Sequence, residues 1–349
     1  MAKSLELLLE NKNMNKILNL FNEKYVIGLF TKKILPLYPN FKSIKKIKIY
    51  AYKKNIWEKT YHVVIKFSTF FITKKNKIIN LPIICSAHSD EPRKNVYTAL
   101  KFLWNNSFSK GYLTVPHPLF YSKEFQGTFY RGVEGNNLYH YIRENKQEEI
   151  NLIIPKTALW FAKLHNTSIS EAKNFNKSNS RIKTVFPGIE HIFQKIKEKY
   201  PYYLNFTENT YKKLIEVEKN FLSSTNQRWL VHGDAHPENI IKMGKKKIGV
   251  IDFTDLCLSD FSRDLGTFLQ QLEFMCDRKI KNKKYTEKIK NLFLETYLAK
   301  QKIKFDDNLQ KRINNYYNWT TMRTATFFLL KSKPEPDRAD KIIKKMINI

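Results

Sequence analysis

Residues 229–266 read WLVHGDAHPENIIKMGKKKIGVIDFTDLCLSDFSRDLG, and this stretch decides the fold. Asp234 opens a loop that Asn239 closes, and Asp252 follows an apolar run. Phosphoryl transfer from a nucleotide needs one carboxylate to orient or deprotonate the attacking hydroxyl, and an amide oxygen plus a second carboxylate to hold magnesium. Magnesium prefers hard oxygen ligands, which Asn239 and Asp252 supply. The stretch therefore indicates a phosphate-transfer site with Asp234 as its catalytic carboxylate.

Two apolar-rich runs, 240–242 and 247–251, lie on either side of Gly244. Such runs with a glycine between them are typical of a β-hairpin. The hairpin would place Asn239, just before its first strand, close to Asp252 at the end of its second. Residues that are 13 positions apart in the sequence are thus expected to be neighbours in space.

The segments His232-Gly233-Asp234, Asn239 and Ile251-Asp252-Phe253 resemble the catalytic and metal-binding segments of the aminoglycoside phosphotransferase and choline kinase superfamily. His-Gly-Asp alone is a weak signal, but three pieces in this order and spacing rarely coincide by chance. The alternative is that Asp234 is a loop carboxylate and Asp252 caps a strand end.

This resemblance implies an α+β, two-lobed protein-kinase-like fold, with a small antiparallel-sheet N-lobe and a larger, mainly helical C-lobe. It also implies ATP as the phosphate donor, Mg²⁺ as the metal, and a hydroxyl of a small molecule as the acceptor. A sugar, an amino alcohol or an aminoglycoside-like compound would fit. The positive charge of the chain argues weakly against aminoglycosides and favours an anionic or neutral acceptor.

The length and composition of the chain indicate its general class of protein. The chain has 349 residues, 42% of them hydrophobic and 27% charged, which is typical of a globular protein with room for two lobes. No run is long and apolar enough for a transmembrane helix, and the N-terminus does not read as a signal peptide. Three cysteines without metal-ligand spacing indicate reduced thiols in a cytoplasmic protein.

The formal charge of +30 would attract nucleotides, nucleic acid or an anionic membrane surface. The competing interpretation is compositional, because an excess of lysine, asparagine and isoleucine can come from an AT-rich genome. Base-reading modules of the RRM or zinc-finger kind are absent from the sequence. Nucleic acid and membrane are therefore not the favoured partners.

The first half of the chain predicts the small lobe. After N-terminal helices, three strands are expected, the first at 47–51, the second over the runs 61–67 and 70–73, and the third at 78–86. A helix from Ser89 or Asp90 to Trp104 and strands at 119–122 and 128–133 would follow. We expect a nucleotide-binding lobe over residues 1–133. A large helical lobe for catalysis and acceptor binding would cover residues 134–349.

This lobe departs from the kinase pattern in two ways. Residues 29–110 contain no glycine, so the usual glycine-rich loop is missing, and the predicted third strand has no lysine. Lys66 on the second strand, or Arg93 early in the following helix, could replace that lysine; an exposed strand lysine is the alternative for Lys66. The resemblance places backbone contacts to adenine at Val133 and Glu134.

The resemblance assigns supporting roles in the second lobe. His232 would bond the backbone of the catalytic loop, and Asp264 would brace that loop through backbone hydrogen bonds. His236 and Asp255 are candidate acceptor contacts, and an exposed histidine and a solvated turn are the alternatives.

Two expectations concern the helices of the second lobe. Pro155 is predicted to begin a helix that runs to Asn166. The helices expected at 187–200 and 207–223 would border the acceptor pocket. The rival function is a non-catalytic kinase-like module that binds a nucleotide or a partner, which the missing lysine and glycine loop favour and the intact Asp234, Asn239 and Asp252 oppose.

Overall fold

The computed structural model describes residues 15–170, 172, 175–184 and 188–347, and the chain forms two compact units. The first unit extends to Ser109 and includes Val115–Glu134, whereas the second comprises Lys110–Thr114 and the chain from Gly135 onward. The helices expected before residue 15 lie outside the described residues. Among the described residues, no helix is long and apolar enough to cross a membrane.

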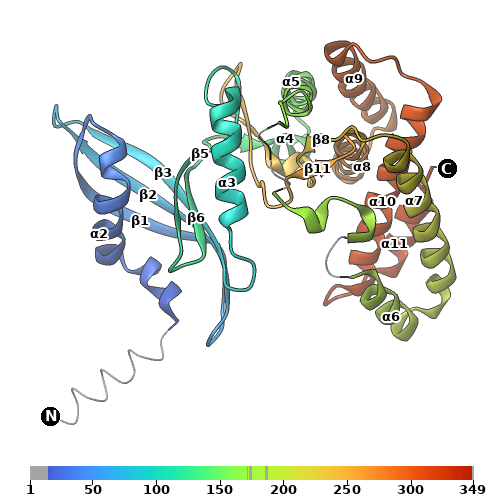
Figure 1. Cartoon of the computed structure of the whole chain (residues 1–349), viewed down its shortest axis with the longest axis horizontal. Coiled ribbons are helices and arrows are strands. Elements are labelled where there is room, and N and C mark those ends of the chain that lie inside the picture. Colours follow the sequence, from blue (N-terminus) through green and yellow to red (C-terminus); the bar gives the residue numbers. More distant parts are fainter. Residues whose placement is uncertain (1–14, 171, 173–174, 185–187, 348–349) are drawn as a thin grey trace, which may run out of the picture. The chain divides into compact units, whose positions relative to one another are not determined.

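The first unit is built on one antiparallel five-stranded sheet with the order β1-β2-β3-β6-β5 (Figure 1). Its strands are β1 (Phe41–Ile56), β2 (Tyr61–Thr73), β3 (Ile78–His88), β5 (His117–Ser122) and β6 (Gly127–Arg131). The runs 61–67 and 70–73, expected to form the second strand, are continuous in β2. Its odd-numbered positions are buried and its even-numbered positions half-buried, because successive side chains point to opposite faces.

Two helices of the first unit cover opposite faces of this sheet. Phe30 of α2 (Glu23–Lys33) packs on the face that carries Phe67 and Phe129, with Phe30 and Phe67 ring centroids 5.1 Å apart. Thr128, which points to the other face, donates a hydrogen bond to the backbone oxygen of Arg93, just before α3 (Lys94–Leu103). The half-buried, even-numbered side chains of β2 therefore lie on the face of the sheet that α3 covers, which we call the α3 face.

The second unit is mainly helical. Its helices are α4 (Leu138–Arg143), α5 (Gln147–His165), α6 (Ile189–Lys199), α7 (Leu204–Ser224), α8 (Ser262–Lys279), α9 (Lys283–Gln301), α10 (Asp307–Leu330) and α11 (Pro336–Ile343). Its short strands are β4 (Leu113–Thr114), β7 (Asn136–Asn137), β8 (Trp229–Val231), β9 (Ile240–Lys242), β10 (Ile248–Val250) and β11 (Cys257–Ser259). The predicted α+β fold, with an antiparallel sheet first and a helical region second, is confirmed.

The short strands bring the catalytic segments together. β9 and β10 form the predicted hairpin, with Gly244 in the turn at φ +101°, a conformation that glycine adopts without strain. The Ile251 N–H donates to the Asn239 backbone oxygen at 3.0 Å, so Asn239 and Asp252 are neighbours as expected. β8 pairs with β11, which fixes the chain on both sides of the loop that carries Asp234.

Two predicted helix starts are wrong. Residues Ser89 and Asp90 lie in a turn, where the Ser89 N–H donates to Tyr61 and the Asp90 N–H to the His88 ring, and α3 begins only at Lys94. α5 begins at Gln147, so Pro155 lies inside the helix. Buried isoleucines at 150, 153 and 154 pack this earlier part of α5 into the core, which outweighs the disruption by Pro155.

Helices α8 and α10 run parallel in close contact. Thr267 Oγ1 lies 3.0 Å from Thr320 Oγ1, and Gln271 Nε2 donates to Thr324 Oγ1 at 3.1 Å, so the contacts advance together along both helices. Gly266 allows the approach, because a Cβ there would lie 2.4 Å from the Ile313 backbone oxygen.

We therefore expect Gly266→Ala to destabilise the protein by about 1–3 kcal/mol, the usual range for forced overpacking. In most helix interiors, the same change stabilises by roughly 0.5–1 kcal/mol. Gly28→Ala in α2 is the matched control, since no heavy atom lies within 4 Å of its added Cβ. Thermal unfolding of both variants measures the difference, and a Gly266→Ala midpoint at or above that of the unchanged protein would contradict the contact.

Candidate active site

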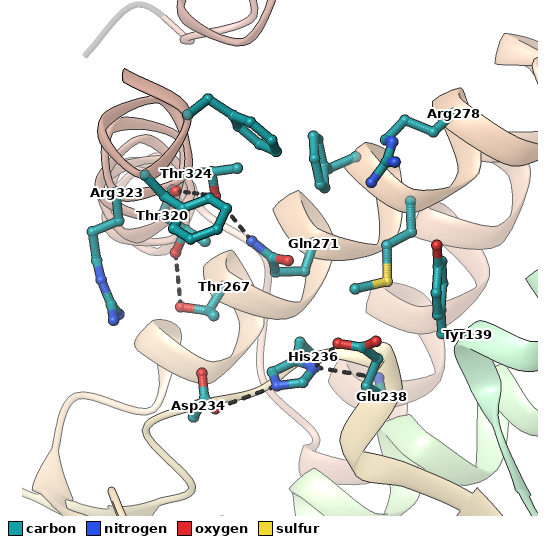
Figure 2. Close-up of a pocket in the computed structure, with 14 residues that line it drawn as sticks. Tyr139, Asp234, His236, Glu238, Thr267, Gln271, Arg278, Thr320, Arg323 and Thr324 are labelled. Carbon is teal, nitrogen blue, oxygen red and sulfur yellow. Dashed lines mark hydrogen bonds and ion pairs between the residues drawn. The ribbon is translucent and has the colours of Figure 1, made fainter. Parts of the chain in front are cut away.

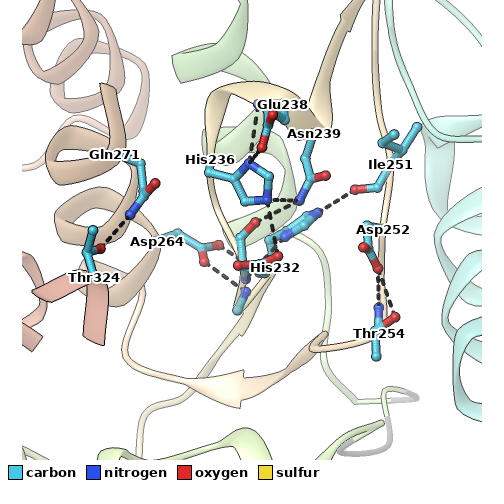
Figure 3. Close-up of polar contacts among 12 residues, drawn as sticks. His232, His236, Glu238, Asn239, Ile251, Asp252, Thr254, Asp264, Gln271 and Thr324 are labelled. Carbon is cyan, nitrogen blue, oxygen red and sulfur yellow. Dashed lines mark hydrogen bonds and ion pairs between the residues drawn. The ribbon is translucent and has the colours of Figure 1, made fainter. Parts of the chain in front are cut away.

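Asp264 holds the loop that carries Asp234 (Figure 3). Its carboxylate accepts the N–H of His232 at 2.7 Å and the N–H of Gly233 at 3.0 Å, and it is fully buried. His165 Nε2 lies 3.1 Å from the same carboxylate. Since a carboxylate only accepts, this nitrogen carries the hydrogen. Burial acts to raise the pKa of Asp264, but the His165 hydrogen bond and nearby charges outweigh it and hold the pKa below its usual value.

His232 and Gly233 shape the same loop. His232 Nε2 donates to the Ile251 backbone oxygen at 2.9 Å, and its Nδ1 accepts the Asp234 N–H at 3.3 Å. Gly233 has φ +83°, and a Cβ there would lie 2.3 Å from the Asp255 backbone oxygen. A side chain at residue 233 is therefore excluded by both conformation and space. The ring of His232 thus ties the catalytic loop to the chain just before Asp252.

Asp234 is held by protein on several sides yet remains reachable. Its side chain is 36% exposed, and its Oδ2 lies 3.3 Å from His236 Nε2. Burial acts to raise the pKa of Asp234, but the His236 hydrogen bond and the charges of His236, His232 and Arg323 lower it well below its usual value. The pKa of His236 is raised in turn, because its bond to Asp234 outweighs burial. Asp234 is therefore an ionised carboxylate at neutral pH.

Asn239 and Asp252 present oxygen atoms suited to a hard cation. Asn239 Nδ2 donates to the Asp234 backbone oxygen at 3.0 Å, and no hydrogen bond within the described chain occupies its Oδ1. Asp252 is exposed, has φ +64°, and accepts the Thr254 hydroxyl at 2.8 Å on Oδ1, leaving Oδ2 open. A non-glycine residue in this conformation is a form of strain that clusters at functional sites. An amide and a carboxylate fit Mg²⁺, which takes its other ligands from water and phosphates.

Asn239 and Asp252 provide only two protein ligands for a metal ion. Nowhere in the described chain do three or more His, Cys, Asp or Glu side chains form a metal-binding group. Asp255, the other nearby carboxylate, lies next to Gly233, and Asn176 Nδ2 donates to its Oδ1 at 3.5 Å. Burial raises the pKa of Asp255, and the charge of Asp234 raises it further. Asp255 does not line the pocket described next.

A pocket of about 390 Å³ opens beside Asp234, within the second unit (Figure 2). The catalytic loop contributes Asp234, His236 and Glu238, and α4 contributes Tyr139. The other lining residues come from one face each of α8 and α10: Thr267, Gln271, Phe274, Met275, Arg278, Thr320, Arg323, Thr324, Phe327 and Phe328. The pocket is thus a site where a hydroxyl compound can reach Asp234.

The helices that form the wall of this pocket are not the ones expected from the sequence. The helices expected at 187–200 and 207–223, which are α6 and α7, contribute no residue to this pocket. Sequence reasoning missed Arg323, Gln271 and their neighbours. The signal was present as polar residues at helical spacing, such as Thr320, Arg323 and Thr324. The sequence indicated only that aromatic residues around them belong to the core or a pocket wall, and Phe327 and Phe328 do line the pocket.

The predicted nucleotide contacts Lys66 and Arg93 belong to the first unit. Lys66 is half-buried on the α3 face of β2, paired in register with Ile84 of β3. Arg93 is buried just before α3, with Nη1 3.2 Å from Glu91 Oε2 and a buried Nε that has no hydrogen-bond partner in the described chain. Lys66 and Arg93 therefore both belong to the face of the five-stranded sheet that α3 covers.

Val133 and Glu134 are the last residues of the first unit, and Gly135 begins the second. Val133 is half-buried and Glu134 exposed. Gly135 has φ +142°, and a Cβ there would lie 1.9 Å from the Lys242 backbone oxygen. The chain thus passes from one unit to the other next to a position that excludes a side chain.

Comparisons with solved structures show the fold. Aminoglycoside phosphotransferase APH(4)-Ia aligns over 92% of this chain and 98% of its own, with a TM-score of 0.54 and 11% identity. Plasmodium vivax ethanolamine kinase aligns over 85% and 80%, with a TM-score of 0.52 and 15% identity. Spectinomycin phosphotransferase in complex with ADP and spectinomycin aligns over 94% and 95%, with a TM-score of 0.51 and 12% identity.

Sequence comparison shows the family. No curated protein sequence matches this chain. The sequence profile of the phosphotransferase enzyme family matches residues 67–301, which include the catalytic stretch and two thirds of the chain. The resemblance stated from three short segments is therefore confirmed, and the chain belongs to the phosphotransferase enzyme family.

Proposed function

We propose that this protein is an ATP- and Mg²⁺-dependent kinase that transfers the γ-phosphate to a hydroxyl of a small molecule. One observation carries the proposal: a single braced loop presents an ionised, accessible Asp234 to a pocket and has Asn239 and Asp252 beside it. ADP in the spectinomycin phosphotransferase complex supports a nucleotide donor.

Asp234 is proposed as the catalytic carboxylate. With a pKa well below its usual value, it is a weak base that does not take a proton from a free hydroxyl. It would instead accept a hydrogen bond from the acceptor hydroxyl, orient its lone pair, and take the proton late, when the bond to phosphorus has largely formed. The hydrogen bond from His236 and the Asp264 brace hold the carboxylate in place for this role.

Asn239 Oδ1 and the Asp252 carboxylate would hold Mg²⁺. Bound there, the metal neutralises charge on the nucleotide phosphates. Lys66 or Arg93 would contact the phosphates in place of the absent third-strand lysine, and the backbone of Val133 and Glu134 would contact the adenine. His232 and Asp264 are proposed as positioning residues.

The experiment that tests this function is calorimetric titration of ATP with and without magnesium. We expect magnesium-dependent binding that Asp252→Ala weakens by at least about tenfold, because even the outer partners of metal ligands contribute about 10- to 100-fold to metal affinity. Glu216→Ala, which removes an exposed carboxylate of α7, is the control and should bind like the unchanged protein.

The outcomes separate the kinase from its rival. Magnesium-dependent binding lost in Asp252→Ala, but kept in Glu216→Ala, supports the kinase. Absence of ATP binding with and without magnesium would reject the ATP-dependent reaction and support the kinase-like interaction module, for which the lack of a lysine on β3 is the relevant observation.

A further inference from the structure

The pocket beside Asp234 contains a cation that forms no ion pair within the described part of the chain. Arg323 of α10 lines the pocket with an exposed side chain and makes no ion pair within the described chain. Its guanidinium carbon lies 5.8 Å from the centre of the Trp319 ring. Figure 2 shows Arg323 on the same wall as Thr320, extending toward the end of the pocket where Asp234 lies.

The pocket has two carboxylates, and both lie next to His236. Asp234 lies 3.3 Å from His236 Nε2, and Glu238 Oε2 lies 3.9 Å from His236 Nδ1. These are the carboxylates among the pocket's lining residues, which also include Arg278 and Arg323, so the lining has no excess of negative charge. A polycationic acceptor needs a lining with excess negative charge, whereas two arginines accompany the two carboxylates of this pocket.

The second arginine lies at the opposite end. Arg278 is 11 positions beyond Thr267 on α8, or about 16 Å along the helix axis at 1.5 Å per residue. Its guanidinium already lies over Phe274, 5.4 Å from the ring centre. Arg323 is instead close enough to Asp234 for their charges to interact. A group bound by Arg323 would therefore lie near the reacting hydroxyl.

We propose that the acceptor carries an anionic group, a carboxylate or a phosphate, close to its reacting hydroxyl, and that Arg323 binds this group. The inference rests on the proposed kinase function, since it names the acceptor class for that site. Arginine is suited to the task, because its planar fork pairs with both oxygens of a carboxylate or phosphate. The Arg323 side chain is exposed in the pocket and forms no ion pair within the described chain, so a bound anion would supply the partner that its guanidinium lacks.

The test measures binding rather than turnover. The full chain, saturated with MgADP, is titrated calorimetrically with D-glycerate, glycerol 3-phosphate, glycerol and the polycation kanamycin. We expect one or both anions to bind at least about tenfold more tightly than glycerol, and Arg323→Met to remove about 10- to 100-fold of that affinity, as for a charge-assisted pair. Comparing glycerate with glycerol 3-phosphate distinguishes carboxylate from phosphate.

Two further variants make the result specific. Lys279→Met removes one exposed cation outside the pocket and should leave anion affinity unchanged. Arg323→Lys keeps the positive charge but lacks the planar guanidinium, so it should retain part of the anion affinity. This variant also tests the proposal if Arg323→Met does not fold. Anion affinity equal to that of glycerol, affinity unaffected by Arg323→Met, or tighter binding of kanamycin would each overturn the proposal.

The two proposals can fail separately. If MgADP does not bind, the kinase function fails, and the same anion titrations without nucleotide still decide whether Arg323 forms an anion site. If MgADP binds but the anions do not depend on Arg323, the kinase function stands and the anionic acceptor is rejected.

Discussion

Replacement of Asp234 by asparagine is expected to lower kcat by a factor of about 10² to 10⁴, the usual contribution of a positioned base. Asparagine preserves the shape of the side chain but cannot accept the proton of the acceptor hydroxyl. Its uncharged amide would also form a weaker bond with His236, which now lies 3.3 Å from the carboxylate. The measurement is the initial rate of ADP formation with the hydroxyl compound that binds most tightly in the titrations described above.

The KM for ATP separates a catalytic from a structural effect. It should stay within about threefold of its original value, because Asp234 is proposed to act on the acceptor. Glu216→Gln serves as the control, since it removes an exposed carboxylate of α7 outside the pocket. Turnover close to normal in Asp234→Asn would remove this residue from the mechanism.

The second large effect is expected for Asp264→Asn. One carboxylate oxygen accepts from His232 and His165 and the other from Gly233, so an amide group would direct its own N–H toward one of these donors. Leaving buried partners unpaired costs about 2–5 kcal/mol of unfolding free energy. The catalytic loop would lose its brace, so kcat should fall as well. Urea unfolding and ADP formation measure the two effects, with Asp337→Asn on the exposed side of α11 as the control.

The pH dependence gives an independent check on Asp264. Its pKa is lowered by folding, so its contribution to stability is complete above the unfolded carboxyl pKa of about 3.9 and is lost as pH falls through the folded value. Unfolding free energies of the original protein and Asp264→Asn should therefore converge below about pH 4. A difference that stayed constant from pH 7 to pH 3 would show that Asp264 does not act through its charge.

The catalytic stretch was predictable because its parts interact locally. A glycine turn between two apolar runs specifies a hairpin, and a hairpin fixes the neighbourhood of Asn239 and Asp252 without reference to the rest of the chain. Helix starts were less predictable. Pro155 reads as a first helical residue, but isoleucines on the preceding turns are buried and extend α5 back to Gln147.

The sequence by itself determined the family, the α+β fold and the residues proposed for phosphate transfer. All three follow from the spacing of residues that are close together in the chain. Only the tertiary structure decided which helices form the pocket wall and which charge it contains. Arg323 lies 89 positions beyond Asp234, and its relation to that residue depends on the parallel contact of α8 with α10 at Gly266. Such a contact is set by side-chain packing between helices distant in the chain, which no local pattern encodes.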